Sequence, residues 1–541
     1  MKVLNTLNLN GNSLTVEELV AATLKTEIRL SDTSWNKVDE SRSFIEEILA
    51  QEKPVYGVNT GLGSFSEVVI SPKKLLLLQN NIIRSHAAGV GKPLSPERVK
   101  RMLILRLNLF AKGHSGISRE TLSHILAFCN AGCVSKVPEQ GSVGASGDLA
   151  PLAHLALGML GEGDMWDPDL GSWQSAKTVI DKYDLPTLKL KPREGLSLIN
   201  GTQMIVCLGA EAIHRAENLV RCADIITSIS VEVLRGTVNA FSPQIHRVRP
   251  HPGQQISARN IRSLLNSDLF PSEISKSHKD CKKVQDAYSI RCAPQVHGIV
   301  YDTLKFVKEI IETEMNSATD NPLVFLDTKT VLSGGNFHGE YPGKALDYLT
   351  IAVSELGSIS ERRIEQMVNR HLNGLPAFLV KDGGFNSGLM IPQTTAAALV
   401  SENKTLCHPA TADSVPTNAA KEDHVSMGNW AARKCLQVLD NVEYILGIEL
   451  MTAIQGIELH RPLKSTKPIE SIFKMVRDSG IAPLDADRFL HPDMETARHL
   501  VAKRKLLNLI QPHWEDWSED LDNNKGRNHN HDVLTNGNRK W

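Results

Sequence analysis

The chain has 541 residues, of which 41% are hydrophobic and 22% are charged, and 60 Lys and Arg residues almost balance 61 Asp and Glu residues. This is the composition of a globular protein, and a net charge of −1 argues against a protein that binds nucleic acid or a membrane surface through bulk charge. No run of about 18 apolar residues predicts a membrane span, and the eight cysteines include no C-x-x-C pair, so we expect reduced thiols in a cytoplasmic protein.

Glycine turns are frequent in residues 1–200, which predict a smaller, mixed region packed on a helical body. Strand-like alternation is confined to short pieces such as Val68–Ile70 and Thr187–Leu190. The most unusual stretch is GSVGASGDLAPLAHLA, residues 141–156, in which a glycine-rich turn leads into an apolar helix. Asp148 lies at the start of that helix, where an aspartate is a good N-cap.

Helical periodicity dominates from about residue 200 onward. One apolar stripe has the three- and four-residue spacing of a helix face: Leu304, Val307, Ile311 and Met315. Similar stripes run through residues 345–368 and 430–459. Helices this long pack side by side in bundles, so we predict a mainly α fold with a long helical bundle over residues 201–514. The polar segment 515–541 predicts a disordered tail.

The glycine-rich stretch does not match the motifs that bind phosphate or carry a serine nucleophile. Gly141, Gly144 and Gly147 are spaced by three and three, whereas a dinucleotide fingerprint needs G-x-G-x-x-G. Residues 144–148 read GASGD, which departs from the G-x-S-x-G nucleophile elbow. The E-x-x-H motif at residues 211–214 has no second copy that would complete a di-iron site. We therefore expect no bound metal.

The tripeptide Ala145-Ser146-Gly147 suggests a different chemistry, in which the backbone itself reacts. A glycine amide nitrogen is unhindered, and a tight turn can bring the Gly147 nitrogen against the carbonyl carbon of Ala145. Ring closure with loss of water, and then loss of the Ser146 hydroxyl as water, would leave an exocyclic methylene, which is a strong electrophile. The alternative is an ordinary glycine-rich helix entry capped by Asp148, and the spacing alone favours that alternative.

Seven other segments accompany this loop: YGVNTGLG (56–63), RSHAAGVGKPLSPER (84–98), LINGTQM (198–204), VQDAYSIRCAPQVHG (284–298), NSATDNP (316–322), SGGNFHGEYPGKALDY (333–348) and EDHVSMGNWAARK (422–434). Together with the loop they resemble the aromatic amino-acid ammonia-lyases, in the same order and over roughly residues 50–460. Within that family the chain resembles the histidine ammonia-lyases, and among these the animal-type branch.

The resemblance implies a function, a prosthetic group and an assembly. Its members eliminate ammonia from an amino acid, which for histidine gives trans-urocanate and is the first step of histidine degradation. It implies that Ala145-Ser146-Gly147 cyclises to 4-methylidene-imidazol-5-one (MIO), with no external cofactor. It also implies an α-helical homotetramer whose active sites combine residues from more than one subunit.

The resemblance carries roles to individual residues. Tyr56 matches the family tyrosine proposed as the catalytic base or proton shuttle, and Asn200 matches the residue that donates a hydrogen bond to the MIO carbonyl oxygen. Arg291 matches the residue that clamps the substrate carboxylate, a task for which the planar guanidinium is suited. Three further matches are Gln285 as an active-site amide, Tyr288 as a conformationally important tyrosine and Phe337 as a residue lining the MIO pocket.

Two positions favour histidine as the substrate. The pair Ser85-His86 is the pattern of the histidine enzymes, and His86 can form a hydrogen bond with an imidazole. Glu422 stands where the phenylalanine and tyrosine enzymes typically have glutamine, and a carboxylate suits an imidazole better than a phenyl ring. We therefore expect Glu422 to bind the substrate and to take part in catalysis.

Two alternatives stay open on the sequence. A tyrosine or phenylalanine ammonia-lyase, or an aminomutase, would use the same MIO group on another substrate. A non-catalytic scaffold would keep the helical fold and leave the loop uncyclised.

Overall fold

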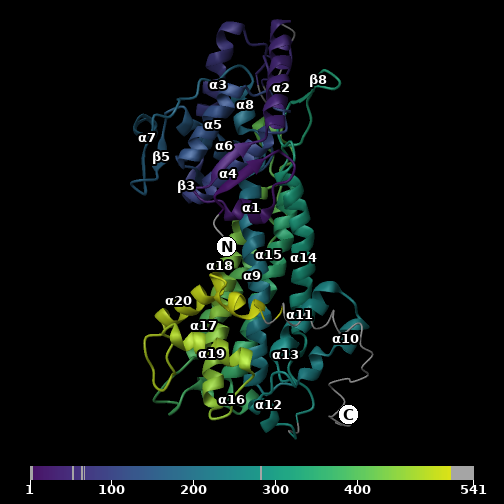
Figure 1. Cartoon of the computed structure of the whole chain (residues 1–541), viewed down its shortest axis with the longest axis vertical. Helices are drawn as coiled ribbons and strands as arrows, with labels where there is room; N and C mark the ends of the chain where they lie inside the picture. The colour runs from purple at the N-terminus through teal and green to yellow at the C-terminus, as the bar shows by residue number, and fades with distance from the viewer. Residues whose placement is uncertain are drawn as a thin grey trace. The chain divides into compact units, whose positions relative to one another are not determined.

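The structure is a computed structural model that describes residues 4–51, 54–61, 65, 68–280, 283–512 and 514. It is mainly helical, as predicted, and its strands are short and occur in two-stranded pairs (Figure 1). The predicted tail, residues 515–541, lies outside the described residues.

The chain divides into two compact units. Unit 1 comprises Met1–His214, Phe306–Tyr348 and Pro409–Leu436, and unit 2 comprises Arg215–Lys305, Leu349–His408 and Gln437–Trp541. The division into residues 1–200 and 201–514, which was drawn from glycine content and periodicity, stays a prediction.

Four long helices contribute residues to both units: α9 (Gln203–Val233), α14 (Ala293–Met315), α15 (Glu340–Val368) and α18 (Gly428–Leu459). The apolar stripes predicted from the sequence fall on α14, α15 and α18. The four α14 stripe residues Leu304, Val307, Ile311 and Met315 are all buried. The prediction of these helices is confirmed, because a sustained 3.6-residue period is the strongest local signal a sequence carries.

Unit 1 holds the other elements of the N-terminal part and a hairpin further along the chain. Its helices are α1 (Val16–Ala21), α2 (Asp32–Ala50), α3 (Pro72–His86), α4 (Pro96–Phe110), α5 (Arg119–Ala131), α6 (Leu149–Met159), α7 (Ala176–Lys182) and α8 (Glu194–Ile199). Its strand pairs are β1 (Thr6–Leu9) with β2 (Glu27–Leu30), β3 (Val90–Pro93) with β4 (Pro138–Gln140), β5 (Asp164–Asp167) with β6 (Ser172–Ser175), and β7 (Leu323–Phe325) with β8 (Thr330–Leu332). The first pair is parallel and the other three are antiparallel.

The helix α4 runs through the core of unit 1. It begins after Ser95, whose hydroxyl accepts the Arg98 amide, and Pro96 occupies its first turn; both are helix-start signals. Every residue from Met102 to Phe110 is buried, including Arg106. Three other helices, α3, α6 and α8, pack against one another, and they position the loops described below.

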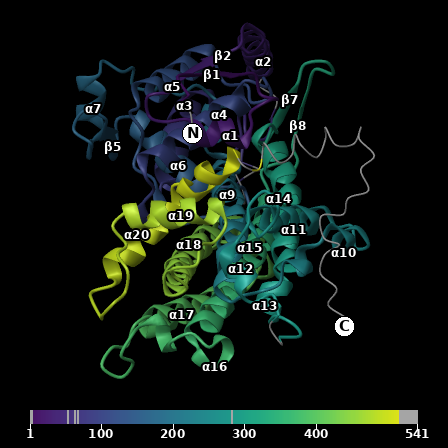
Figure 2. The same cartoon turned by 60° about the horizontal axis from the view of Figure 1, so that its bottom comes forward.

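Unit 2 is built from the remaining parts of the long helices and shorter helices around them. These are α10 (Pro243–Arg247), α11 (Pro252–Leu264), α12 (Glu273–Ser277), α13 (Tyr288–Arg291), α16 (Arg370–Asn373), α17 (Met390–Leu406), α19 (Lys467–Asp478) and α20 (His491–Ala502). The long helices lie side by side here (Figure 1 and Figure 2). Glu449 on α18 joins them, since it accepts from Ser230 on α9 at 2.7 Å and pairs with buried Arg363 on α15 at 2.6 Å.

The short strands were predicted poorly. Thr187–Leu190 forms no strand, and in the Val68–Ile70 piece only Val69 forms an isolated bridge, with Thr60. The four observed pairs have strands of three or four residues. Segments this short show too few alternations to be distinguished from loops.

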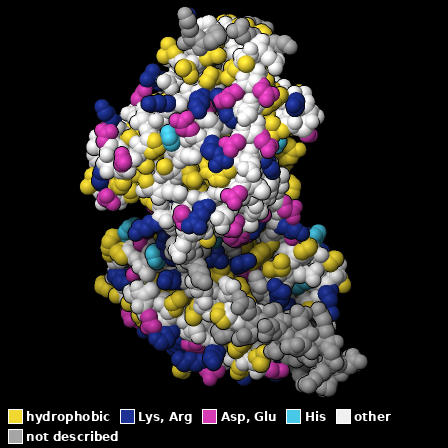
Figure 3. Space-filling model, turned by 45° about the horizontal axis from the view of Figure 1, so that its top comes forward, with side chains coloured by type: hydrophobic (Ala, Val, Ile, Leu, Met, Phe, Trp, Pro, Cys, Tyr) yellow, Lys and Arg dark blue, Asp and Glu magenta, His cyan; other side chains and the backbone are white. Residues whose placement is uncertain are grey.

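The surface agrees with the near-zero net charge. Figure 3 shows one face, on which Lys and Arg side chains are interspersed with Asp and Glu side chains. Within the described residues no helix combines the length and the hydropathy needed to cross a bilayer.

Candidate active site

The loop with the Ala-Ser-Gly sequence connects β4 to α6 in unit 1, and all three of its glycines have backbone conformations that favour glycine, Gly141 with φ of 130°. Gly144 has φ of 69° and Gly147 has φ of 72°. A Cβ atom at Gly147 would collide with the carbonyl oxygen of Gly201, and one at Gly144 would collide with the Ser426 hydroxyl. The tight packing therefore requires glycine at both positions. Because glycine has no side chain, the backbone nitrogen of Gly147 is unhindered.

Two distant segments hold this loop. Gly144 O accepts from Ser426 Oγ at 2.9 Å and from Gly339 N at 3.0 Å. Met427 N donates to Val143 O at 2.8 Å. The segments that follow Glu422 and Phe337 in the sequence are thus hydrogen-bonded to the loop.

Asp148 precedes α6, as predicted, but its side chain does not cap that helix. Its Oδ2 accepts instead from Met204 N and Ile205 N, both at 2.9 Å, so it caps the first turn of α9. Asp148 is fully buried, and this burial raises the pKa of its carboxyl from 3.8 to about 6. The prediction that Asp148 caps α6 was wrong. Its side chain accepts from the free amides at the start of α9, more than fifty residues along the chain.

Ser146 is hydrogen-bonded to Glu422, the residue expected to choose the substrate. Ser146 Oγ donates to Glu422 Oε1 at 2.6 Å, and Thr417 Oγ1 donates to Glu422 Oε2 at 2.5 Å. Thr417 and Glu422 also exchange backbone hydrogen bonds of 2.9 and 3.3 Å. The Ser146 hydroxyl is the group that ring formation would remove, so its contact with Glu422 belongs to the precursor of the ring.

Three residues between Thr417 and Glu422 have positive φ without being glycine. Asn418, Ala419 and Ala420 have φ of 51°, 52° and 61°. A left-handed conformation costs an alanine about 1 kcal/mol or more. The backbone pair between Thr417 and Glu422 closes this strained turn, which aims the Glu422 side chain at Ser146.

Asn200 follows α8 and contacts the loop from another side. Asn200 Nδ2 donates to Ser146 O at 3.1 Å. Ser146 O is the oxygen that would become the ring carbonyl if Gly147 N closed onto the Ala145 carbonyl carbon. Asn200 Oδ1 is buried and has no hydrogen-bond partner among the described residues, which leaves an acceptor for a bound group.

Buried Arg106 holds the backbone on which Asn200 is placed. Its guanidinium donates to Asn200 O at 2.7 Å, to Gln203 Oε1 at 2.8 Å and to Ser197 O. Burial lowers the pKa of Arg106 from 12.5 to about 10. The cation is therefore still charged at neutral pH, and it fixes the junction of α8 and α9.

His86 is the last residue of α3, and the structure defines its tautomer. Its Nδ1 lies 2.8 Å from Ile82 O, which can only accept, so Nδ1 carries the proton. Nε2 is then an acceptor, and it has no partner among the described residues. The strand pairing of β3 with β4 places the segment after His86 beside the segment that enters the loop.

Tyr56 lies in the turn before α3 and is half-buried. A Cβ atom at the next residue, Gly57, would touch Leu196 of α8 and Pro322. This turn therefore packs on the helix that ends at Asn200. No described residue hydrogen-bonds the Tyr56 hydroxyl.

Phe337 is half-buried and lies two residues before Gly339. Its neighbour His338 stacks on His424, with ring centroids 6.0 Å apart and planes 6° apart. His338 Nε2 also lies 3.2 Å from His424 O. The segments that carry Phe337 and Glu422 are thus joined to each other as well as to the loop.

The remaining predicted residues belong to unit 2. Arg291 Nε donates to Asp286 O at 3.1 Å, and its guanidinium lies 4.5 Å from the centre of the Tyr288 ring. Tyr288 is 71% exposed and Gln285 is exposed. These three residues form one group around α13, and Arg291 keeps donors for a ligand.

A family model described as aromatic amino acid lyase matches residues 14–478. The chain belongs to this family. It is 54% identical over 519 residues to histidine ammonia-lyase of Caenorhabditis elegans. The aligned region covers 95% of this chain and 76% of that protein.

Two solved structures place this member within the lyase fold. Histidine ammonia-lyase from Trypanosoma cruzi matches with a TM-score of 0.86 and 49% identity over 94% of this chain and 95% of the other. Tyrosine aminomutase from Streptomyces globisporus matches with a TM-score of 0.87 and 34% identity over 94% and 99%. Since this fold serves enzymes with different names, the substrate must be argued from the side chains.

Several residues of this aromatic amino acid lyase site were missed from the sequence. Arg106 carried a signal, because it interrupts the apolar run MLILRLNLF and an arginine there must be buried with partners. Thr417 carried none, since a hydroxyl in a loop is ordinary, and Ser426 lay within the segment 422–434 without any sign of its contact with Gly144. The residues of the loop fit the predicted ring: Gly147 is required as glycine, Ala145 is buried, and Asn200 already donates to the oxygen that would become the ring carbonyl.

Proposed function

We propose that this chain eliminates ammonia from L-histidine to give trans-urocanate. The observation that carries the proposal is the contact of Glu422 with Ser146, because it places a carboxylate beside the reacting loop. Similarity to proteins named histidine ammonia-lyase, at 54% and 49% identity, supports the choice of substrate.

Ala145-Ser146-Gly147 is the source of the MIO group in this proposal, and no external cofactor is needed. The group supplies an electrophile to which the substrate attaches, through its amine or its ring, and this attachment makes loss of the weakly acidic β-proton feasible. Asn200 Nδ2 holds the carbonyl oxygen on which negative charge would collect, as an oxyanion-hole donor does. Arg106 keeps Asn200 in that position through the backbone.

The substrate is bound by groups at its two ends, which different subunits of the tetramer proposed below can supply. Arg291 takes the carboxylate, and it keeps donors that no described residue occupies. Glu422 accepts from an imidazole N–H, and His86 Nε2 offers a second acceptor for the ring. We assign Tyr56 as the base for the β-proton, with Gln285, Tyr288 and Phe337 lining the site.

Phenylalanine, one of the rival substrates, fits these side chains less well. A phenyl ring cannot donate a hydrogen bond to Glu422, so the carboxylate would lose its solvation without a partner. The same argument disfavours phenylalanine as the substrate of an aminomutase built on this site.

The proposal includes a homotetramer in the cytoplasm. Tyr288, at 71% exposure, and exposed Gln285 lie on the surface of a single chain although they belong to the proposed site. A second subunit would enclose them. The described cysteines form no disulfide bond, which agrees with a reducing compartment.

Intact-protein mass and a histidine assay on one preparation test the reaction. We expect a mass two waters below that of the sequence and formation of trans-urocanate. Ser146→Ala should lose the activity, because the methylene carbon comes from Ser146, whereas the control Ser172→Ala on β6 should keep both the activity and the lowered mass. A full sequence mass for the wild-type chain, or undiminished activity of Ser146→Ala, would contradict the ring.

The substrate is tested separately with phenylalanine, tyrosine and Glu422→Gln. We expect no cinnamate or coumarate from the wild-type chain. Glu422→Gln should reduce urocanate formation at least tenfold, since it removes the charged acceptor for the imidazole. Cinnamate formed in place of urocanate would contradict histidine as the substrate.

A further inference from the structure

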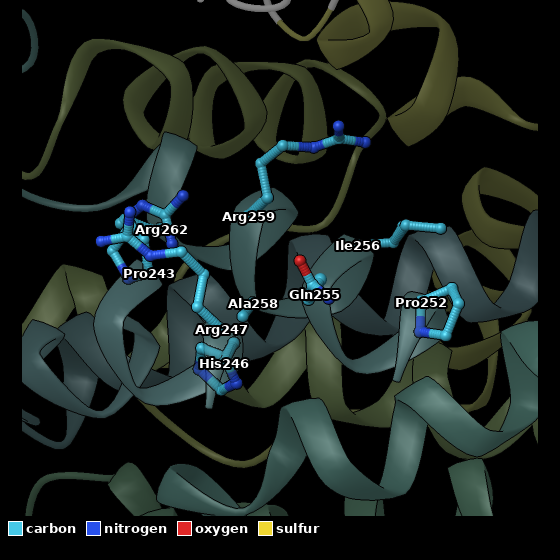
Figure 4. A pocket seen from close by; sticks show the side chains of 9 residues that line it. All are labelled: Pro243, His246, Arg247, Pro252, Gln255, Ile256, Ala258, Arg259 and Arg262. Atoms are coloured by element: carbon cyan, nitrogen blue, oxygen red, sulfur yellow. The ribbon is translucent and has the colours of Figure 1, made fainter. Parts of the chain in front are cut away.

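Unit 2 contains a basic pocket between α10 and α11, none of whose lining residues belongs to the site described above. Its volume is about 420 Å³, and it is lined by three arginines, one histidine, one glutamine and four apolar residues (Figure 4). Pockets that hold small organic ligands have volumes of about 300–1,000 Å³, so this pocket is large enough for one.

The order of the residues along the chain explains why three arginines line this pocket. Arg247 is the last residue of α10, and Arg259 and Arg262 are three apart on α11, where residues at this spacing share a face. In Figure 4 the Arg247 and Arg262 side chains extend to the same side of the pocket, next to Pro243. The sequence separates these arginines, and the turn between the two helices brings them to one cavity.

The described residues that line this pocket carry positive charge and no carboxylate. Arg247 and Arg259 have no hydrogen-bond or ion-pair partner in the described part of the chain. Burial and the repulsion of Arg259 lower the pKa of Arg262 from 12.5 to about 10. A bound anion would reduce the repulsion between Arg259 and Arg262.

The floor of the pocket is polar but uncharged. His246 is buried, its Nε2 lies 3.1 Å from Ala240 O, and its Nδ1 lies 2.9 Å from Gln254 Nε2. Both ring nitrogens are thus satisfied in the neutral form, and burial lowers the pKa of His246. Arg262 is held in place because its NH1 donates to Phe241 O at 2.5 Å.

The other walls are apolar. Pro252 and Ile256 lie at the opposite end of the pocket from Arg247 and Arg262 in Figure 4. Apolar walls reduce the local dielectric constant, which strengthens the attraction between a guanidinium and an anion. They also provide a surface for an apolar group attached to that anion.

We propose that this pocket binds a phosphate group, free or as a small phosphomonoester, through Arg247, Arg259 and Arg262. Guanidinium groups match the oxygens of a phosphate in pairs of parallel hydrogen bonds. A phosphate dianion compensates a cluster of three cations better than a monovalent anion does. The site is separate from the proposed elimination reaction and does not depend on it.

Calorimetric titration of the purified full chain with inorganic phosphate tests the proposal, at an ionic strength held constant with sodium chloride. We expect saturable binding of one phosphate per chain. Phenyl phosphate tests whether the ligand is free phosphate or an ester, since the apolar walls should make it bind more tightly than inorganic phosphate if esters are the ligand.

Arg247→Gln and Arg259→Gln are the decisive variants, because both side chains are exposed and their replacement removes no core packing. Each should weaken phosphate binding about tenfold or more, as expected for a lost charge-assisted hydrogen bond. Arg370→Gln is the matched control, an exposed arginine at the start of α16 in the same unit, and it should bind like the wild-type chain.

Three results would overturn the proposal. They are heat signals that do not saturate, binding that chloride replaces at equal ionic strength, and affinities that stay the same in Arg247→Gln and Arg259→Gln. Far-UV circular dichroism of each variant shows whether it is folded, and urocanate formation without phosphate shows independently whether the elimination site is intact.

Discussion

Glu422 shows how one carboxylate can serve first the loop and then the substrate. In the structure its two oxygens accept from different hydroxyls, Oε1 from Ser146 and Oε2 from Thr417. Ring formation would remove the Ser146 hydroxyl and leave Oε1 without that donor. Thr417 would then be the remaining side-chain partner of Glu422 among the described residues, and it would keep the freed oxygen aimed at the site where a substrate imidazole must bind.

Thr417→Val should therefore lower activity on histidine without unfolding the chain. The substitution removes one hydrogen bond to a charged group, which corresponds to a loss in kcat/KM of about tenfold. Thr417→Ser keeps the hydroxyl and should stay within about twofold of the wild-type chain. Steady-state assays of urocanate formation measure both. An equal loss in the two variants would mean that Thr417 acts through packing and not through its hydroxyl.

At the scale of residues, the sequence indicated the groups that take part in chemistry better than the groups that hold them. Glu422 and Asn200 were found through motifs, and the structure brings both to Ser146. Thr417 was not found, because its role depends on a turn whose left-handed residues could not be recognised in an unremarkable NAA sequence. The predicted roles of Tyr56 and His86 stay predictions, since no contact tests them.

At the scale of elements, the junction between α8 and α9 organises unit 1. Asn200 ends α8, and the first turn of α9 is capped by Asp148 from the reacting loop. The Arg106 guanidinium on α4 holds the same junction, because it donates to the backbone carbonyl oxygens of Ser197 and Asn200. A movement of α9 would therefore shift the loop and Asn200 together, which keeps their mutual geometry.

Asp148→Ala should destabilise the start of α9. Two buried amides, Met204 N and Ile205 N, would lose their acceptor, and a lost cap together with unsatisfied donors costs about 2–4 kcal/mol. Hydrogen exchange at residues 204 and 205 measures the effect directly and should become faster. Asp32→Ala, at an exposed first-turn position of α2, is the control and should change stability by less than about 0.5 kcal/mol. Unchanged protection at residues 204 and 205 would contradict the capping role.

The elements themselves were predictable where they were long. The stripes on α14, α15 and α18 repeat over many turns, so the sequence specified them. The strands were not predictable, because pairs such as β3 and β4 contain only three or four residues each. The target of Asp148 was also hidden, since a cap between distant elements leaves no local pattern.

At the scale of the whole molecule, each unit buries charge in its core. In unit 1, Arg193 pairs with Asp320 at 3.0 Å and both side chains are fully buried. In unit 2, Arg363 and Glu449 pair at 2.6 Å and are also fully buried. Removing one partner of such a pair costs about 3–5 kcal/mol, because the other charge is left buried without compensation. The stability of this protein therefore depends on pH and charge more than its near-neutral composition suggests.

Glu314 provides the sharpest test of that dependence. It lies on α14, accepts from Thr202 Oγ1 at 2.7 Å and forms no ion pair with a described residue. Burial raises the pKa of Glu314 from 4.5 to about 7. The folded chain thus holds this proton up to a higher pH than the unfolded chain does, so the free energy of unfolding must fall as the pH rises from about 4.5 to about 7.

Glu314→Gln should remove this loss of stability at higher pH. The full shift corresponds to about 3 kcal/mol, and because the residue is only half-buried we expect the variant to gain about 1–2 kcal/mol over the wild-type chain at pH 8. At pH 5 the carboxyl is protonated in the folded chain, and the two proteins should unfold at nearly the same temperature. Thermal unfolding followed by circular dichroism across this pH range measures the difference.

Glu309→Gln, an exposed position on the same helix, is the control and should show no such trend. A gain for Glu314→Gln that is equal at pH 5 and pH 8 would contradict titration as its cause, because only the ionised form is penalised by burial.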